Sequence, residues 1–234
     1  RRGLGRGRGG LPATGSGVGG WCGWRAWMDR RRERARELIV ASTREAYAGD
    51  HRDLVDAERH LREARDLDPH DVSGPTLLLF VHSQRALEDG AFSAGYLRPA
   101  IQRAEALESE GLGAYLDAAR ALLAAAEGGH EEARTQLAAA LAARPRDPAI
   151  LYLVGRLEQR LGSEEALTHL EAATEGEATL NAPRVALAEA RYDGGEADEA
   201  LELLGQVLAN RADPLRARLW RAFRTSDAGE PDAL

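Results

Sequence analysis

The apolar positions of the chain recur in a pattern of a small residue, an apolar residue four positions later and another three positions after that. The pattern occurs five times, beginning at Ala57, Ala100, Ala133, Ala166 and Ala200. Residues spaced i, i+4 and i+7 lie on one face of an α-helix. No stretch alternates between apolar and polar residues for long enough to indicate a strand. The pattern therefore predicts an all-α chain in which one helical face is repeated.

Turn and cap residues divide this pattern into helix pairs. Glycines at 49, 90, 128, 162 and 195 precede its five copies, and the last three copies keep a period of 33 to 34 residues. Asp147-Pro148 and Asp213-Pro214 each place a capping carboxylate before a proline in the first turn of a helix. We expect helix pairs at 34–48 and 53–67, 75–88 and 96–108, 114–127 and 130–143, 148–161 and 164–174, and 182–193 and 197–209, followed by a capping helix at 214–224.

A helix–turn–helix unit of about 34 residues, with a glycine turn, a small residue early in its second helix and a closing proline, resembles the tetratricopeptide repeat. The best match is residues 114–180, where the run from Gly128 to Ala133 is followed by Leu137, Ala140 and Pro145. The resemblance covers residues 34–224 and implies an α-solenoid of about five repeats with a C-terminal capping helix. It also implies close helix packing at small residues, which are Ala57, Ala100, Ala133, Gly155, Ala166, Ala188 and Ala200.

The resemblance further implies that the first helix of each repeat lines a concave surface suited to extended or helical peptides. The side chains expected there are Phe80, Gln84, Tyr115, Tyr152, Arg156, Gln159, Glu189 and Tyr192. Positions at which some members of the family grip a peptide carboxylate carry mostly Ala, Val, Leu and Tyr here, so that mode is not expected. The simpler interpretation of the tyrosines is ordinary packing with a solvated hydroxyl.

Charge is distributed unevenly along the chain. The net charge is -7, but residues 1–36 carry +8 and the rest carries -15, and every basic residue is Arg. Nucleic acid is usually met by a basic face, so the acidic body argues against a nucleic-acid partner. No window approaches about 18 consecutive strongly apolar residues, which argues against a polytopic membrane protein.

Motifs for catalysis, cofactors and metals were sought and none was found. The chain has no Lys, so it cannot contain a phosphate-binding loop ending in Gly-Lys-Ser/Thr. The single cysteine, Cys22, excludes a thiolate zinc site, and His51, His60 and His70 lack the spacing of metal ligands. We therefore expect no enzyme activity, no cofactor and no metal.

Residues 1–33 are rich in Gly and Arg, and three interpretations of them remain open: a disordered tail or linker, a degenerate or truncated membrane-proximal anchor, and an export signal. Trp21, Trp24 and Trp27 recur every three residues beside several arginines, an arrangement that could contact anionic headgroups weakly. Residues 225–234 are expected to be a disordered tail. A cytoplasmic or membrane-associated location is expected, with the periplasm as the alternative.

These features favour a non-enzymatic scaffold that binds a peptide or partner protein on the concave face of the superhelix. The alternative is the docking or sensory region of a larger, membrane-anchored bacterial signalling enzyme. The Trp/Arg junction near the N-terminus motivates this second interpretation.

Overall fold

The computed structural model describes residues 17–88, 94–107, 110–176 and 179–210, and within them the chain forms ten α-helices and no strand. The helices are α1 (Gly17–Ala48), α2 (His51–Leu67), α3 (Ser73–Glu88), α4 (Ala94–Glu105), α5 (Gly113–Ala126), α6 (His130–Ala143), α7 (Pro148–Leu161), α8 (Ala166–Gly176), α9 (Asn181–Asp193) and α10 (Ala197–Asn210). A short 3-10 helix, Glu110–Leu112, precedes α5. The predicted capping helix and the C-terminal tail lie outside the described residues.

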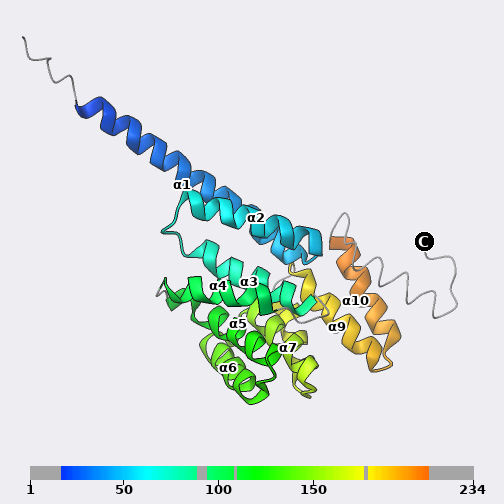
Figure 1. Ribbon diagram of the computed structural model, residues 1–234. Helices are drawn as coiled ribbons and strands as arrows, with labels where there is room; N and C mark the ends of the chain where they lie inside the picture. The colour runs from blue at the N-terminus through cyan, green and yellow to red at the C-terminus, as the bar shows by residue number, and fades with distance from the viewer. Residues whose placement is uncertain (1–16, 89–93, 108–109, 177–178, 211–234) are drawn as a thin grey trace, which may run out of the picture.

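Consecutive helices form five hairpins, α1/α2, α3/α4, α5/α6, α7/α8 and α9/α10, and the hairpins stack in chain order (Figure 1). Four turns contain a glycine with positive φ: Gly49 (79°), Gly128 (85°), Gly162 (72°) and Gly195 (90°). An L-residue rarely adopts this left-handed conformation, so glycine is required where each first helix reverses direction. The chain is therefore an α-solenoid of repeated helical hairpins, which confirms the predicted fold class.

Small residues bring the helices close together. The seven residues predicted to pack between helices are all buried. Gly155 of α7 is the tightest example, because a Cβ at this position would lie 2.8 Å from Leu170 Cγ and 3.1 Å from the Ala166 carbonyl oxygen of α8. Any larger residue at 155 would push α7 and α8 apart.

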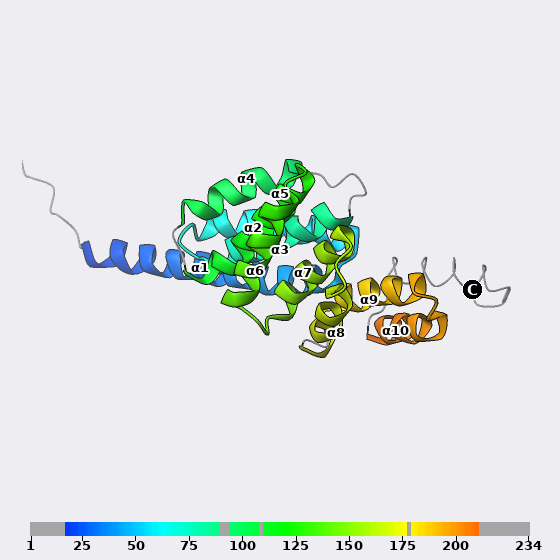
Figure 2. The same cartoon turned by 90° about the horizontal axis from the view of Figure 1, so that it is seen from below.

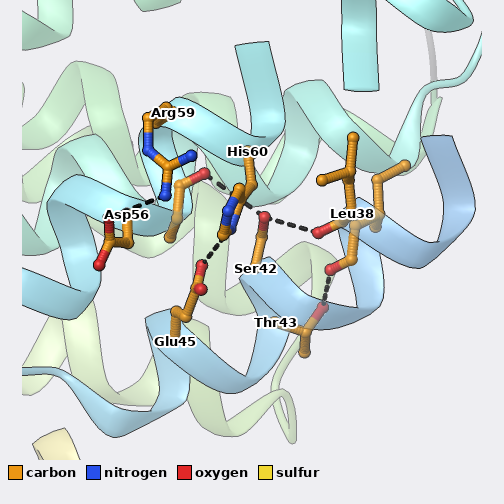
Figure 3. A network of polar contacts seen from close by, with 9 residues as sticks. Leu38, Ser42, Thr43, Glu45, Asp56, Arg59 and His60 are labelled. Carbon is orange, nitrogen blue, oxygen red and sulfur yellow. Dashed lines mark hydrogen bonds and ion pairs between the residues drawn. The ribbon is translucent and has the colours of Figure 1, made fainter. Parts of the chain in front are cut away.

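Polar contacts fix α1 on α2 (Figure 3). The buried Ser42 hydroxyl donates to the Leu38 carbonyl at 2.8 Å within α1 and lies 3.4 Å from the Ala57 carbonyl of α2. One turn further along, His60 Nδ1 lies 2.9 Å from Glu45 Oε2. Serine on α1 faces alanine on α2, so the two backbones approach closely and the first hairpin has a defined register.

Helix α1 is longer than the sequence predicted. It begins at Gly17, whereas the first helix was expected to begin at residue 34, after a segment interpreted as a disordered tail, a membrane-proximal anchor or an export signal. In Figure 1 its N-terminal part continues beyond the end of α2. Arg31 holds this part to the body, because its guanidinium donates to the Asp66 carbonyl at 2.6 Å and to the Leu67 carbonyl at 3.3 Å, at the C-terminus of α2. Glycines at 17, 19, 20 and 23 therefore do not prevent this part of the chain from forming a helix.

The first helices of the hairpins pack against one another across the solenoid as well as along it. Helix α3 contacts α7, and α1 contacts α9. A Cβ at Gly49 would lie 3.1 Å from Ala182 Cβ at the start of α9, which shows how closely these distant segments meet. Residues 78–87 of α3 are all buried, so this helix is enclosed on every side. The inner face of the solenoid is therefore largely filled by its own side chains.

No helix among the described residues combines the length and the apolar character that a membrane span needs.

Candidate functional site

Four aromatic rings meet on the inner side of the solenoid, each contributed by the first helix of a different hairpin. Phe80 of α3 lies at the centre and makes edge-to-face contacts with Tyr47 of α1, Tyr115 of α5 and Tyr152 of α7. The ring centroids are 6.3, 6.4 and 6.4 Å apart, which is a favourable separation for such pairs. The four residues lie 33, 35 and 37 positions apart in the sequence, so the repeat itself assembles this aromatic cluster.

A cavity of about 340 Å³ opens beside the aromatic cluster. Helices α1, α3, α5 and α7 and the segment before α7 surround it. Its lining residues are Ile39, Thr43, Tyr47, Val72, Ser73, Thr76, Leu77, Phe80, Gly111, Tyr115, Arg144 and Ala149. Most of these surfaces are apolar or aromatic, and hydroxyl groups and one guanidinium supply the polar contacts.

Asp147 organises one side of this cavity. As predicted from Asp147-Pro148, it is the N-cap of α7, and its carboxylate accepts the backbone N–H of Ala149 at 3.0 Å and of Ile150 at 3.4 Å. The same carboxylate accepts the Tyr115 hydroxyl at 3.0 Å. Burial, followed by the adjacent negative charge and this hydrogen bond, raises the pKa of Tyr115 well above its usual value of 10. Tyr115 therefore remains a protonated donor whose position is fixed by Asp147.

Arg144 places a positive charge at the edge of the cavity. Its guanidinium lies 5.6 Å from the centroid of the Tyr115 ring, and it donates to Asp147 Oδ2 at 3.1 Å and to the Gly111 carbonyl at 3.2 Å. The Arg144 side chain is 42% exposed, so it can also meet a ligand. A guanidinium in this position favours a hydrogen-bond acceptor or a negative charge on whatever enters the cavity.

The residues predicted to form one continuous groove are separated into several environments. Phe80, Tyr115 and Tyr152 belong to the aromatic cluster, but Phe80 and Tyr152 are each only 1% exposed. Gln84 is fully buried within α3. The prediction of an open peptide-contacting surface is therefore corrected for Phe80, Gln84 and Tyr152, because α7 packs across α3 and covers the inner face.

Three other predicted residues form a polar brace between α7 and α9. Arg156 donates from Nη1 to Gln159 Oε1 at 2.9 Å and to Glu189 Oε2 at 2.9 Å. The side chains of Arg156 and Glu189 are only 11% and 18% exposed, so their main contacts are with each other. Tyr192, the last of the predicted set, is half-buried beside a small apolar core that includes Val185 and Leu204. The brace joins two hairpins and leaves little of its surface for a partner.

A buried charged cluster between α2 and α3 was not expected from the sequence. Glu58 pairs with Arg85 and Arg62, and His82 Nε2 lies 3.9 Å from Glu58 Oε1. Burial lowers the pKa of His82 from 6.5 to about 4, outweighing the opposing effect of Glu58. His82 is therefore neutral at physiological pH. In the described part of the chain, no group of three or more His, Cys, Asp and Glu side chains is placed to hold a metal ion.

A second hollow of about 350 Å³ lies along α6 and α7. It is lined by Leu137, Leu141 and Leu161, with Glu158 and Glu165 beside them, and has no aromatic residue. The cavity beside the aromatic cluster combines an apolar, aromatic surface with an accessible cation, so it is the stronger candidate site. Sequence reasoning missed Tyr47, Thr76 and Arg144, and the repeat spacing alone could have revealed Tyr47.

Comparisons with known proteins add a weak structural likeness. No family model matches the chain, and no curated protein sequence matches it. Among solved structures, the chain is similar to a monomeric mutant of IFIT1 with m7Gppp-AAAA, at 14% sequence identity and a TM-score of 0.48. The match covers 92% of this chain and 63% of the IFIT1 chain, so this chain spans less than two thirds of that protein's length. A likeness this low is no guide to what this chain binds.

Proposed function

We propose that this chain is a protein-interaction scaffold whose cavity between α1, α3, α5 and α7 receives an apolar side chain from a partner segment. The observation that carries the proposal is the cavity itself: about 340 Å³ beside an aromatic cluster, with Arg144 at its edge. Ligand sites of proteins are mostly apolar hollows of about 300–1,000 Å³ with a few polar groups that fix orientation.

The chemistry of the cavity indicates which segment it would accept. Ile39 and Leu77, which are partly exposed, offer apolar contact to an aromatic or long aliphatic side chain. The hydroxyls of Thr43 and Thr76 already donate to the carbonyls of Ile39 and Val72, four residues earlier, so toward a ligand they can act only as acceptors. Arg144 would donate a hydrogen bond to a backbone carbonyl or to an acidic side chain next to the inserted side chain. The proposed ligand is therefore a short segment with one apolar anchor and a neighbouring acceptor.

This proposal moves the binding site relative to the sequence prediction. The expected groove extended over α7 and α9, where Arg156 and Glu189 bind each other. The proposed site lies on the earlier hairpins and uses Tyr115 from the predicted set. It assigns the chain no catalytic step and no nucleic-acid ligand. No observation in the structure favours the alternative of a docking region within a larger signalling enzyme, which remains a prediction from sequence.

The test uses random peptides displayed on phage and selected against the full chain, followed by affinity measurements on the enriched peptides. The key variant is Thr76→Trp, which would fill the cavity. Its matched control is Thr135→Trp, because Thr135 also lies on a helix with its hydroxyl donating to the carbonyl four residues earlier, but on the exposed face of α6. If the anchor side chain contributes about 2 kcal/mol to the free energy of binding, blocking its cavity should weaken binding about thirtyfold in Thr76→Trp. Thr135→Trp should bind as tightly as the parent chain.

A second pair of variants tests the charge at the edge. Arg144 and Arg134 each pair with an acid three residues away, Asp147 and Glu131, and both side chains are solvent-accessible. Arg144→Gln should lower the affinity for peptides that carry an acidic residue beside the anchor, whereas Arg134→Gln should leave that affinity unchanged. The proposal is refuted if no peptide is enriched, or if the enriched peptides bind Thr76→Trp as tightly as the parent chain.

A further inference from the structure

Helix α1 packs on α2 through a seam of side chains, and this seam continues along α1 beyond the end of α2. Ala35 and Leu38 of the seam pack against Ala64 of α2. Arg31 makes the last contact, on two backbone carbonyls at the C-terminus of α2. Upstream of Arg31, α1 continues beyond α2, as both Figure 1 and Figure 2 show. The buried and half-buried members of the seam recur in steps of three and four residues, as in two helices packed side by side, and are Met28, Arg31, Ala35, Leu38 and Ser42.

Two exposed tryptophans extend the seam upstream. At about 100° per residue, Trp24 points in the same direction as Ser42, about five turns later, and Trp27 lies about 60° to one side. Ser42 is buried under α2, whereas Trp24 is 56% exposed and Trp27 is 46% exposed. In the described part of the chain, no other helix lies along α1 at the level of the tryptophans. The face that α2 covers further along α1 is therefore exposed here.

Where α2 covers the seam, arginines on its two sides meet acidic residues. Arg32 and Arg34 lie about 80° to either side of Trp24 around the helix. Arg32 Nε lies 3.9 Å from Asp68 Oδ2, just after α2, and Arg34 Nε lies 3.9 Å from Glu63 Oε1 of α2. The helix that binds this seam within the chain thus carries acids beside its apolar stripe.

Upstream of α2, two more arginines flank the seam in the same way. Arg25 lies about 100° from Trp24 on one side, and Arg30 about 120° on the other. Both are exposed and form no hydrogen bond or ion pair with the described residues. The acids of this stretch, Asp29 and Glu33, lie about 140° or more from Trp24, on the far side of the helix. The exposed part of the seam therefore has positive charge on both flanks.

The space beside the exposed part of the seam suits one further helix. From Gly17 to Arg31, α1 rises about 21 Å at 1.5 Å per residue, which is about four turns. Helix α2 lies on the same side of α1 as the tryptophans, so a flat partner such as a lipid surface would meet α2 before it covered the seam. A helix is only about 10 Å across, so it can lie along α1 in line with α2.

We propose that the N-terminal part of α1 binds an amphipathic helix of a partner protein. The apolar stripe of that helix packs on Trp24 and Trp27, and acidic residues on its flanks face Arg25 and Arg30. Complementary flanking charges select the partner in helix pairs. A second copy of α1 fits less well, because its own flanks carry arginines. The site is separate from the cavity beside the aromatic cluster, so binding here does not depend on the ligand of that cavity.

The experiment measures the binding of designed peptides to the full chain. The probe is a tryptophan-free peptide of about four helical turns, stapled on its outer face, with leucine along its apolar stripe and glutamate on both flanks. Its matched control carries lysine in place of every glutamate. We expect the glutamate peptide to bind about tenfold or more tightly than the lysine peptide, to shift the tryptophan emission to the blue, and to bind more weakly at high salt. Equal affinities of the two peptides, or no binding of either, would overturn the proposal.

Variants of α1 test whether the glutamate peptide lies on the seam. Trp24→Ala with Trp27→Ala should weaken its binding about tenfold or more, since tryptophans are among the strongest interface anchors. Arg25→Gln with Arg30→Gln should weaken it about fivefold or more. Alanine favours helix, so far-UV circular dichroism of the tryptophan variant should match that of the parent chain. If both double variants bind the glutamate peptide as tightly as the parent chain, the peptide lies elsewhere and the proposal is wrong.

Matched controls change similar side chains away from the seam. Val55→Ala removes an apolar side chain of α2 that is 42% exposed. Arg59→Gln with Arg134→Gln removes two exposed arginines of the body. These variants should bind the glutamate peptide as tightly as the parent chain, and peptides selected for the cavity should bind every variant of this set equally. Failure here and failure of the proposed function are therefore distinguishable.

Two other occupants of the seam have outcomes of their own. If the chain dimerises in analytical ultracentrifugation and loss of both tryptophans abolishes the dimer, the occupant is a second copy and the proposal is wrong. If polyglutamate binds the parent chain as tightly as the glutamate peptide does, and loss of both tryptophans changes neither affinity, the segment attracts acidic polypeptides without a helical partner. That result also overturns the proposal.

Discussion

The close contact between α7 and α8 at Gly155 allows a quantitative prediction of how one added methyl group changes the free energy of unfolding. Glycine inside a helix costs about 0.5–1 kcal/mol relative to alanine, so Gly→Ala at an unobstructed position should stabilise the protein by that amount. Gly205 in α10 is such a position, since a Cβ there would meet no atom within 4 Å. At Gly155 the same methyl would lie 2.8 Å from Leu170 Cγ and 3.1 Å from a backbone oxygen that cannot move alone.

Overpacking of a filled contact costs about 1–3 kcal/mol, which exceeds the gain in helix propensity. We therefore expect Gly155→Ala to lower the free energy of unfolding by up to about 2 kcal/mol, and Gly205→Ala to raise it by about 0.5–1 kcal/mol. Urea titrations followed by far-UV circular dichroism measure both, and thermal melts should show shifts of about 2–4 °C per kcal/mol. If Gly155→Ala stabilises the chain as much as Gly205→Ala, α7 and α8 are not in the contact described and the repeat register is wrong.

Three further predictions concern the core and its titrating groups. Phe80→Ala should lower the free energy of unfolding by about 3–5 kcal/mol in urea titrations, because it removes the centre of the aromatic cluster; a loss below about 1 kcal/mol would mean that the rings do not converge. His82 keeps a pKa of about 4 in the fold against 6.5 when unfolded, so the unfolded chain takes up the proton first as pH falls. Stability should therefore decrease between pH 6.5 and 4 by roughly 3 kcal/mol more in the parent than in His82→Leu, and equal pH profiles would contradict the burial of this ring. Asp147→Ala should cost about 1 kcal/mol as a lost helix cap and lower the pKa of Tyr115 toward 10, which ultraviolet titration of the phenol would detect; an unchanged Tyr115 titration would exclude the hydrogen bond.

Local chemistry made the helices predictable. A turn that needs positive φ requires glycine whatever surrounds it, so Gly128 and Gly162 located their turns from the sequence alone. Asp147-Pro148 located the start of α7 for the same kind of reason, since the cap and the proline act on the first turn of their own helix. Among the helices that the structure describes, only α1 begins far from its predicted start, and Arg31 stabilises that part of α1 through carbonyls that lie 35 and 36 residues away.

The candidate site was less predictable because it depends on how far each hairpin rotates relative to the previous one. That rotation brings α7 across α3, buries Phe80 and Tyr152, and leaves the cavity at the other side of the cluster. The sequence pattern specifies which face of a helix is apolar, but it does not specify which of several apolar faces pack against each other. Arg144 was missed for a related reason: it lies between two helices, and only the folded chain places it beside Tyr115.

The contacts of α1 with α9 and of α3 with α7 have a consequence for how the chain folds. In an open solenoid each repeat touches only its neighbours, so folding can begin anywhere, ends can fray independently, and stability is a sum of nearest-neighbour terms. Here Gly49 meets Ala182, 133 positions later in the sequence, and Arg160 donates to the carbonyl of Leu87. Forming such contacts requires closure of long loops, which slows folding and ties the first and last hairpins to a single transition. Deleting α9 and α10 should therefore weaken the first hairpin, far away along the chain, and not only the hairpin next to the cut.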